Sequence, residues 1–318
     1  MSGDVGRGSG AGKLILFGEH AVVYGTPAIV AGLSRGCTAE VRPAGGSSGP
    51  EAGLELRRVT DADEEPSSIG NPTTVKAFRA IRDTFPELEG ADIAARVDVH
   101  IPIGVGLGSS ASMSAALGRA FGDLTDREDL VADAVSAGEE VFHGNPSGID
   151  QLAAMEGGLH FFRRTEGPAG PGMETAPLDT PSFRVAICVA GPASSTAAMV
   201  DGVAGLRERE PELFEHLELL IGDITRKASK ALQDGDLERV GELMDINHGA
   251  LVSLGVSTDE LDQACYIARR AGAVGAKLTG AGGGGCVFAL LPENGGHGVV
   301  DTWREAGLEA FEVTIGQD

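Results

Sequence analysis

The chain has 318 residues and carries 47 acidic against 25 basic side chains, a formal net charge of −22 that argues against nucleic acid or an anionic membrane as a partner. No run of 18 apolar residues suits a membrane span, and residues 1–12 lack the apolar region of a signal peptide, so we expect a cytoplasmic protein. The four cysteines stand singly in apolar stretches, which indicates buried thiols rather than a zinc site or a disulfide framework.

The first half of the chain alternates strand-like and helix-like segments. Residues 14–17 form a short apolar run, and residues 95–101 alternate apolar and polar side chains, as a half-buried strand does. Between them Asn71 is a good N-cap and Pro72 suits the first position of a helix. The apolar side chains that should share one face of this helix are Val75, Phe78, Ile81 and Phe85.

The stretch 167–181 contains four prolines and little apolar content, which predicts an exposed connection. A chain of this length exceeds one compact core and fits two packed lobes. We therefore expect an N-terminal lobe at 1–166 and a C-terminal lobe at 182–318.

The second half is typical of an α+β lobe. Helix-like segments cover residues 206–221 and 237–251, and a capping box of Ser257 with Glu260 should open a third helix that runs to Gly272. Strand-like runs follow at residues 286–291 and 311–315.

A glycine-rich segment after the strand at 95–101 is predicted to bind phosphate. Glycines let backbone N–H groups approach an anion, and the helix expected behind them adds unpaired N–H groups and a positive dipole end. A turn without chemical role is the alternative, which the order of strand, glycines, hydroxyls and helix disfavours. The residues expected to bind the nucleotide are Pro102, Gly104, Gly106, Leu107, Gly108, Ser109, Ser110 and Ala111.

Two other nucleotide motifs are excluded. A Walker A loop needs Gly-Lys followed by Ser or Thr, whereas Lys13 of the one Gly-Lys pair is followed by Leu14. The glycines at 280, 282 and 285 match the Rossmann spacing, but the strand-like run at 286–291 follows them where that motif requires a helix.

Four segments, in order along the chain, resemble the GHMP kinase superfamily. They are residues 12–28 with Gly-Glu-His at 18–20, the phosphate loop 102–111, residues 139–150, and residues 277–286. Within the superfamily the first and third segments are similar to the mevalonate kinase family. One departure is the segment 193–198, where family members carry an Arg-Ser-Thr-Lys-like sequence and this chain has no basic residue.

The resemblance implies a two-lobed GHMP kinase fold. Its N-terminal lobe would be like ribosomal protein S5 domain 2, its C-terminal lobe would be ferredoxin-like, and the nucleotide would bind between them. The implied reaction is phosphoryl transfer from ATP, with Mg²⁺, to the C5 hydroxyl of mevalonate in isoprenoid biosynthesis. A homodimer is a weaker expectation that rests on the related enzymes alone.

The resemblance also implies residue roles. Asp150 would be the base toward the accepting hydroxyl, with Lys13 beside it. Ser110 and Glu139 would hold Mg²⁺. The residues on the substrate side would be Glu19, His20, Asp150 and Thr279.

Alternatives remain open at this stage. Taken alone, Asp150 would be a turn or cap residue, Lys13 a charge at a strand edge, and Glu139 part of a solvated helix face, while His143 is interpreted as structural. The chain could instead be another GHMP kinase acting on phosphomevalonate, a sugar or homoserine, or a nucleotide-binding regulator without catalysis. The acidic surface, with five lysines against twenty arginines, indicates a halophilic protein, although ordinary acidic proteins and GC-rich genomes give similar compositions.

Overall fold

The structure is a computed structural model that describes residues 5–44, 53–60, 67–68, 70–144, 148–167 and 170–316. The chain forms two compact units. The first comprises residues 1–13, 33–103 and 108–157, and the second comprises residues 14–32, 104–107 and 158–318. Strands β1 (Gly6–Phe17) and β2 (Ala28–Pro43) therefore contribute to both units. The linear division into lobes at 1–166 and 182–318 stays a prediction.

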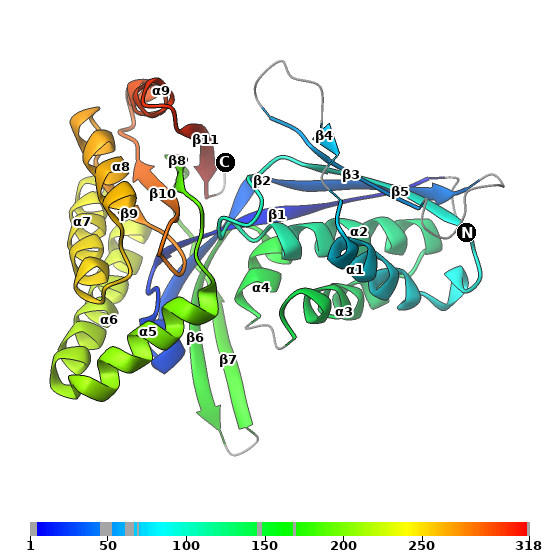
Figure 1. The fold of residues 1–318 in the computed structure, drawn as a ribbon, viewed down its shortest axis with the longest axis horizontal. Helices are drawn as coiled ribbons and strands as arrows, with labels where there is room; N and C mark the ends of the chain where they lie inside the picture. The colour runs from blue at the N-terminus through cyan, green and yellow to red at the C-terminus, as the bar shows by residue number, and fades with distance from the viewer. Residues whose placement is uncertain are drawn as a thin grey trace. The chain divides into compact units, whose positions relative to one another are not determined.

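The first unit is a sheet with helices on one face, where α1, α2 and α3 lie in Figure 1. Its strand order is β4-β3-β5-β2, and β1 pairs with β2. Strands β2 and β5 are antiparallel, from Cys37 opposite Val99 to Pro43 opposite Ile93. The remaining elements are β3 (Leu54–Arg58), β4 (Ser67–Ser68), β5 (Ile93–Val99), α1 (Pro72–Asp83), α2 (Ser109–Thr125), α3 (Val131–His143) and α4 (Ile149–Glu156), with 3-10 turns at Pro86–Leu88 and Glu128–Leu130.

The helix expected after Asn71 is confirmed. The Asn71 side chain accepts hydrogen bonds from the backbone N–H groups of Thr73 and Thr74, and the Thr74 hydroxyl accepts in return from the Asn71 N–H. Phe78 and Ile81 are buried, as the spacing predicts, whereas Val75 is half-buried and Phe85, also buried, lies beyond the end of the helix. Where strand β1 packs on helix α2, alternate residues of the strand are glycines. A Cβ at Gly6, Gly8 or Gly10 would overlap a carbonyl oxygen of α2. Strand β1 and helix α2 therefore pack backbone against backbone.

The second unit contains a four-stranded sheet of order β11-β8-β10-β9, and helices α7, α8 and α9 pack on it (Figure 1). Its core is built around Trp303, Ile221, Leu251, Leu261 and Val287. In the same unit the first part of β2 pairs with β6, and β6 pairs with β7. The elements are a 3-10 turn at Ala21–Tyr24, β6 (Leu159–Gly167), β7 (Gly170–Pro177), β8 (Phe183–Gly191), α5 (Thr196–Arg209), α6 (Pro211–Asp234), α7 (Leu237–Ser253), α8 (Asp259–Arg270), β9 (Gly275–Leu278), β10 (Gly285–Leu290), α9 (His297–Glu305) and β11 (Glu309–Ile315).

Three local expectations differ from the structure. The helix expected at 206–221 is two helices, because Glu210 leaves helical geometry and Pro211, which has no N–H to donate, starts α6. The expected capping box is also wrong: Thr258 caps α8 by accepting from the Leu261 N–H, and the Ser257 hydroxyl donates to Asp262. Within 167–181, residues 172–177 are exposed as expected, but they form strand β7 rather than an irregular connection.

Two further expectations agree with the described part of the chain. All four cysteines are buried as free thiols. No helix there is long and apolar enough to cross a membrane.

Candidate active site

The predicted phosphate loop has the backbone geometry that its glycines suggest. Gly104, Gly106 and Gly108 have φ of 74°, 89° and 71°, values that side chains other than glycine rarely adopt. Gly108 is the N-cap of α2 and supplies no side-chain acceptor, so the N–H groups of the first turn remain available to a ligand. Around them Pro102, Leu107 and Ala111 are buried, and Ser109 and Ser110 are partly exposed. The glycine loop therefore leads into a 17-residue helix whose first turn has no side-chain cap.

Lys13 and Asp150 form an ion pair in the first unit. Lys13 lies on β1 and Asp150 in the first turn of α4, and Lys13 Nζ is 3.0 Å from Asp150 Oδ1. The lysine side chain is 8% exposed and the aspartate 31%, so the carboxylate remains reachable from solvent. The alternative in which Asp150 caps the helix is wrong, because Gly148 occupies the N-cap position. Residues 145–147 of the same motif lie outside the described residues.

Ser110 and Glu139, the expected metal ligands, lie next to a third residue. The Ser110 hydroxyl is 3.1 Å from His143 Nε2, and the same nitrogen is 3.8 Å from Glu139 Oε2. Glu139 and His143 are four residues apart on α3 and therefore share one helix face. His143, interpreted from sequence as structural, thus contacts both predicted ligands.

The Glu139 carboxyl group is buried without a hydrogen-bond partner for either oxygen among the described residues. Burial, and secondly the Asp150 charge, raise the pKa of Glu139 to about 7, while Ser110 and Lys13 oppose that shift. An unpaired buried carboxyl beside a serine hydroxyl fits Mg²⁺, which takes hard oxygen ligands and usually only one or two from the protein. The described residues contain no cluster of three or more acidic, histidine or cysteine side chains suited to a metal.

Glu19 forms a buried ion pair in the second unit. Its Oε1 accepts a hydrogen bond from Lys277 Nζ, and both side chains are 0% exposed. Lys277 Nζ also donates to the Leu278 carbonyl. Desolvation lowers the pKa of Lys277, and the Glu19 charge opposes this. The other carboxylate oxygen, Glu19 Oε2, has no partner in the described part of the chain.

His20 and Thr279 bind backbone groups of the same unit. His20 Nε2 is 2.9 Å from the carbonyl oxygen of Ala281, so this nitrogen carries the proton. Burial lowers the pKa of His20, which keeps the ring neutral at pH 7 and leaves Nδ1 as a hydrogen-bond acceptor. The Thr279 hydroxyl donates to the Ile15 carbonyl at 2.9 Å and accepts from the Ile15 N–H at 3.2 Å.

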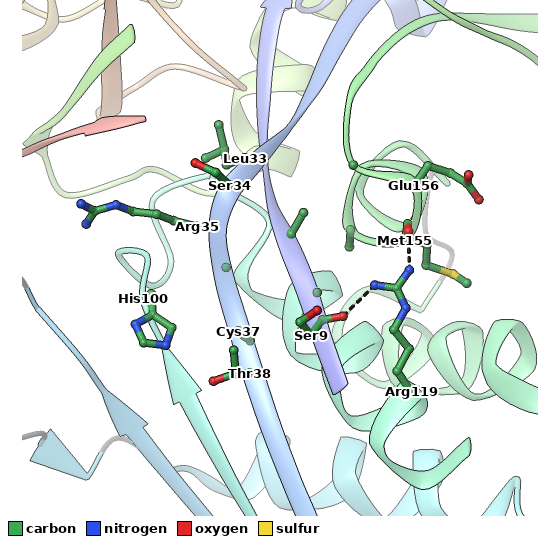
Figure 2. Close-up of a pocket in the computed structure, with 15 residues that line it drawn as sticks. Ser9, Leu33, Ser34, Arg35, Cys37, Thr38, His100, Arg119, Met155 and Glu156 are labelled. Carbon is green, nitrogen blue, oxygen red and sulfur yellow. Dashed lines mark hydrogen bonds between the residues drawn. The ribbon is translucent and has the colours of Figure 1, made fainter. Parts of the chain in front are cut away.

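A groove of about 650 Å³ in the first unit lies apart from these residues. Residues of the paired strands β1 and β2, His100 and the end of α4 line it (Figure 2). Its wall includes Arg119 of α2, whose guanidinium donates to the carbonyl oxygens of Ser9, at 2.7 Å, and of Met155 (Figure 2). Arg119 therefore ties the end of α4 to β1, the two elements that carry Asp150 and Lys13.

The structure distributes the predicted site residues between the two units. Lys13, Asp150, Ser110 and Glu139 belong to the first unit, and Glu19, His20 and Thr279 to the second. Sequence reasoning did not assign roles to Lys277 or His143. The signal for Lys277 was its place two residues before Thr279 in a recognised motif; the signal for His143 was its spacing of four residues from Glu139.

Comparisons with known proteins place the chain among related sequences and structures. A family model described as the GHMP kinases N terminal domain matches residues 73–158, and one described as GHMP kinases C terminal matches residues 228–308. The mevalonate kinase of Thermococcus gammatolerans is 35% identical over 336 residues, covering 96% of this chain and 98% of the relative. That of Aeropyrum pernix is 32% identical, with coverages of 98% and 96%. A crystal structure of L. major mevalonate kinase in complex with R-mevalonate aligns with a TM-score of 0.84 at 30% identity, over 98% of this chain and 96% of that one.

Proposed function

Because the chain belongs to the GHMP kinases, we propose that it transfers the γ-phosphoryl group of ATP to the C5 hydroxyl of mevalonate, a step of isoprenoid biosynthesis. The observation that carries the proposal is the pair of Lys13 and Asp150 at 3.0 Å. Near-complete coverage of mevalonate kinases at 30–35% identity supports mevalonate as the acceptor.

The phosphate loop is proposed to bind the triphosphate of ATP. The backbone N–H groups at the start of α2 have no side-chain cap and can donate to an anion, and the dipole of a long helix favours negative charge at that end. Such donors lie in fixed positions before the reaction and lose little on reorganisation as charge develops on the transferred group. A nucleotide-binding regulator would need this loop but would have no use for a base.

Asp150 is proposed to accept the proton of the attacking hydroxyl. The adjacent Lys13 ammonium, 3.0 Å away, orients the carboxylate, and it can stabilise charge on the phosphoryl oxygens in the transition state. Phosphoryl transfer needs positioning and charge neutralisation rather than a covalent intermediate, and these two side chains supply both.

Ser110 and Glu139 are proposed to hold Mg²⁺, which when bound would neutralise phosphate charge. The Ser110 hydroxyl must offer an oxygen lone pair to the metal, and its neighbour His143 can orient that hydroxyl through the 3.1 Å contact. Glu139 must be deprotonated to act as a ligand.

A panel of acceptor alcohols tests this function. ADP release is measured with ATP, magnesium and, in turn, mevalonate, phosphomevalonate, galactose and homoserine, using Asp150→Asn as the matched inactive control. We expect turnover with mevalonate only. Turnover with another alcohol would show that the chain is a GHMP kinase of different specificity, an outcome that the missing basic residues at 193–198 would then explain. ATP hydrolysis independent of every acceptor would contradict the proposal.

A further inference from the structure

Three alternate residues near the C-terminus bind the turn that carries Glu19 and His20, all within the second unit. Lys277 pairs with Glu19, the Thr279 hydroxyl makes two hydrogen bonds to Ile15, and the Ala281 carbonyl accepts from His20. Lys277 lies on β9 and Thr279 directly follows that strand, so one short segment makes all three contacts. We call this set of contacts the 277–281 brace.

The turn needs such support because its backbone is strained. Gly18 has φ of 96°, and His20, a residue with a side chain, has φ of 60° and ψ of −49°. Glycine adopts a positive φ without strain, but the conformation of His20 costs on the order of 1–3 kcal/mol and persists only where surrounding contacts hold it. Glu19 lies between these two residues, and the turn is held by two side-chain contacts, that of the Glu19 carboxylate with Lys277 and that of the His20 ring with the Ala281 carbonyl.

Lys277 itself is held rigidly. Its ammonium lies 5.2 Å from the centre of the Phe288 ring and 5.9 Å from that of Phe17. Strand β9 pairs with β10 on one side. The other edge of β9 has no neighbouring strand in the described part of this sheet, and two side chains accept hydrogen bonds from its backbone instead. Asp245 accepts from the Ala276 N–H at 3.0 Å, and His248 Nδ1 accepts from the Leu278 N–H at 3.4 Å. With both edges bonded, the direction of the Lys277 side chain is fixed.

We propose that Lys277 is a positioning residue for the acceptor site, acting through Glu19 to fix the turn that presents the His20 ring. On this view Glu19 does not contact the acceptor, although the family resemblance places it on the substrate side. The carboxylate is 0% exposed, and one of its oxygens is occupied by Lys277. The inference rests on the proposed function in that it assumes an acceptor alcohol bound near His20.

The energetics of a buried pair suggest the variants to use. Removing one partner leaves an uncompensated charge in the interior, which is strongly destabilising, whereas replacing both partners by neutral groups of similar volume is often close to neutral. Lys277→Met and Glu19→Gln are the single variants, and their combination is the neutral pair. Lys230→Met is the matched control, because Lys230 forms an exposed ion pair with Asp234 in the same unit and its side chain is 78% exposed.

The experiment measures kcat and both Michaelis constants for the wild type, the two single variants, the double variant and the control. We expect the double variant to fold and to lose about 10- to 100-fold in kcat/KM for the acceptor, the scale of a small misplacement, while KM for ATP changes less than about twofold. Folded single variants should lose the same factor, so that the effects are not additive. A nitrogen-15 spectrum should show His20, identified by the loss of its signal in His20→Asn, as the Nε2–H tautomer in the wild type and as a mixture in the double variant.

Several results would overturn the inference. A double variant with wild-type kcat/KM would show that the pair positions nothing. A loss in Glu19→Gln far larger than in Lys277→Met would show that Glu19 contacts the acceptor directly. A double variant that does not fold would make the pair a requirement of the fold. If the wild type proves to use another alcohol, the same variants are assayed with that alcohol, so failure of the proposed function and failure of this inference remain distinguishable.

Discussion

At the scale of single residues, the main feature of the candidate site is the ion pair between Lys13 and Asp150. Taken alone, Lys13 would be a strand-edge charge and Asp150 a turn residue, and the 3.0 Å contact shows that the two side chains are paired. The Lys13 side chain is nearly buried, so its position is fixed by its surroundings. The Asp150 carboxylate is partly exposed, so a molecule from solvent can reach it.

Asp150→Asn tests that assignment. The change removes the base and hardly alters volume, so we expect the variant to fold and to keep its nucleotide affinity with a loss of roughly 10²-fold or more in kcat. Glu156→Gln, at the exposed end of the same helix, is the matched control and should be near wild type. Near-normal turnover in Asp150→Asn would show that this carboxylate is structural.

The sequence indicates some site residues and not others for a physical reason. Lys13, Ser110 and Asp150 lie in short motifs whose neighbours along the chain set their context. The partner of Glu19 is 258 positions away, and a pairing over that distance has no local signal. The contact between His143 and Glu139 could have been predicted from the sequence, because a spacing of four residues on a helix puts both side chains on one face.

At the scale of helices and strands, Arg119 joins helix α4 to strand β1. Its guanidinium donates hydrogen bonds to the carbonyl oxygens of Met155 and Ser9. Arg119→Met keeps the apolar stem and removes both donors. Since hydrogen bonds from charged groups contribute about 1.5–3 kcal/mol each, and water can replace the donor at the exposed Ser9, we expect the free energy of unfolding to fall by about 1–3 kcal/mol. Hydrogen exchange should quicken in α4 and kcat should decrease.

The control for Arg119→Met is Arg226→Met, which breaks an exposed pair with Asp223 within one helix and should change stability by less than about 1 kcal/mol. Equal hydrogen-exchange protection of α4 in wild type and Arg119→Met would show that packing alone positions the helix.

His248, which binds the edge of β9, should make the free energy of unfolding of the second unit depend on pH. Burial, followed by the Arg269 charge, lowers the pKa of His248; Lys277 adds to the shift and Asp262 opposes it. Below pH 6.5 the unfolded chain binds a proton that the folded chain resists, so the free energy of unfolding falls as pH falls. Protonation would also remove the acceptor for the Leu278 N–H.

His248→Gln isolates that contribution, because a glutamine can accept a hydrogen bond but does not titrate. Urea unfolding at pH values from 5 to 8 should show wild type losing stability relative to His248→Gln as pH falls below 6.5, with a constant difference above it. Parallel curves over the whole range would contradict a role for His248.

The local sequence pattern predicted the presence of helices and strands better than it predicted the residues at which they begin and end. The helix after Asn71 and the strand at 286–291 follow from capping and apolar runs, and both are present. The break at Glu210 was missed although Pro211 marks it, because apolar periodicity continues across the two helices. Strand β7 was missed because its residues are exposed and proline-rich, and it forms by pairing with β6 rather than by burying a face.

Net charge acts on the whole molecule. At about 0.01 M ionic strength the screening length is about 30 Å, so a chain of net charge −22 repels itself and slows the approach of anionic ATP and mevalonate; at about 1 M it is about 3 Å. We therefore expect the melting temperature and the initial rate to be maintained or to rise up to molar KCl, with free magnesium held constant. A steady fall of both from dilute buffer would contradict the halophilic interpretation.

The identity of the phosphorylated product tests the central claim most directly. The purified protein is incubated with ATP, magnesium and R-mevalonate, and the product is examined by phosphorus NMR with proton coupling. Transfer to the C5 hydroxyl predicts a new phosphomonoester signal split into a triplet by the two C5 methylene protons, appearing in step with ADP and absent with Asp150→Asn. Unchanged mevalonate after full consumption of ATP, or a phosphoester on the tertiary C3 hydroxyl with no such splitting, would contradict it.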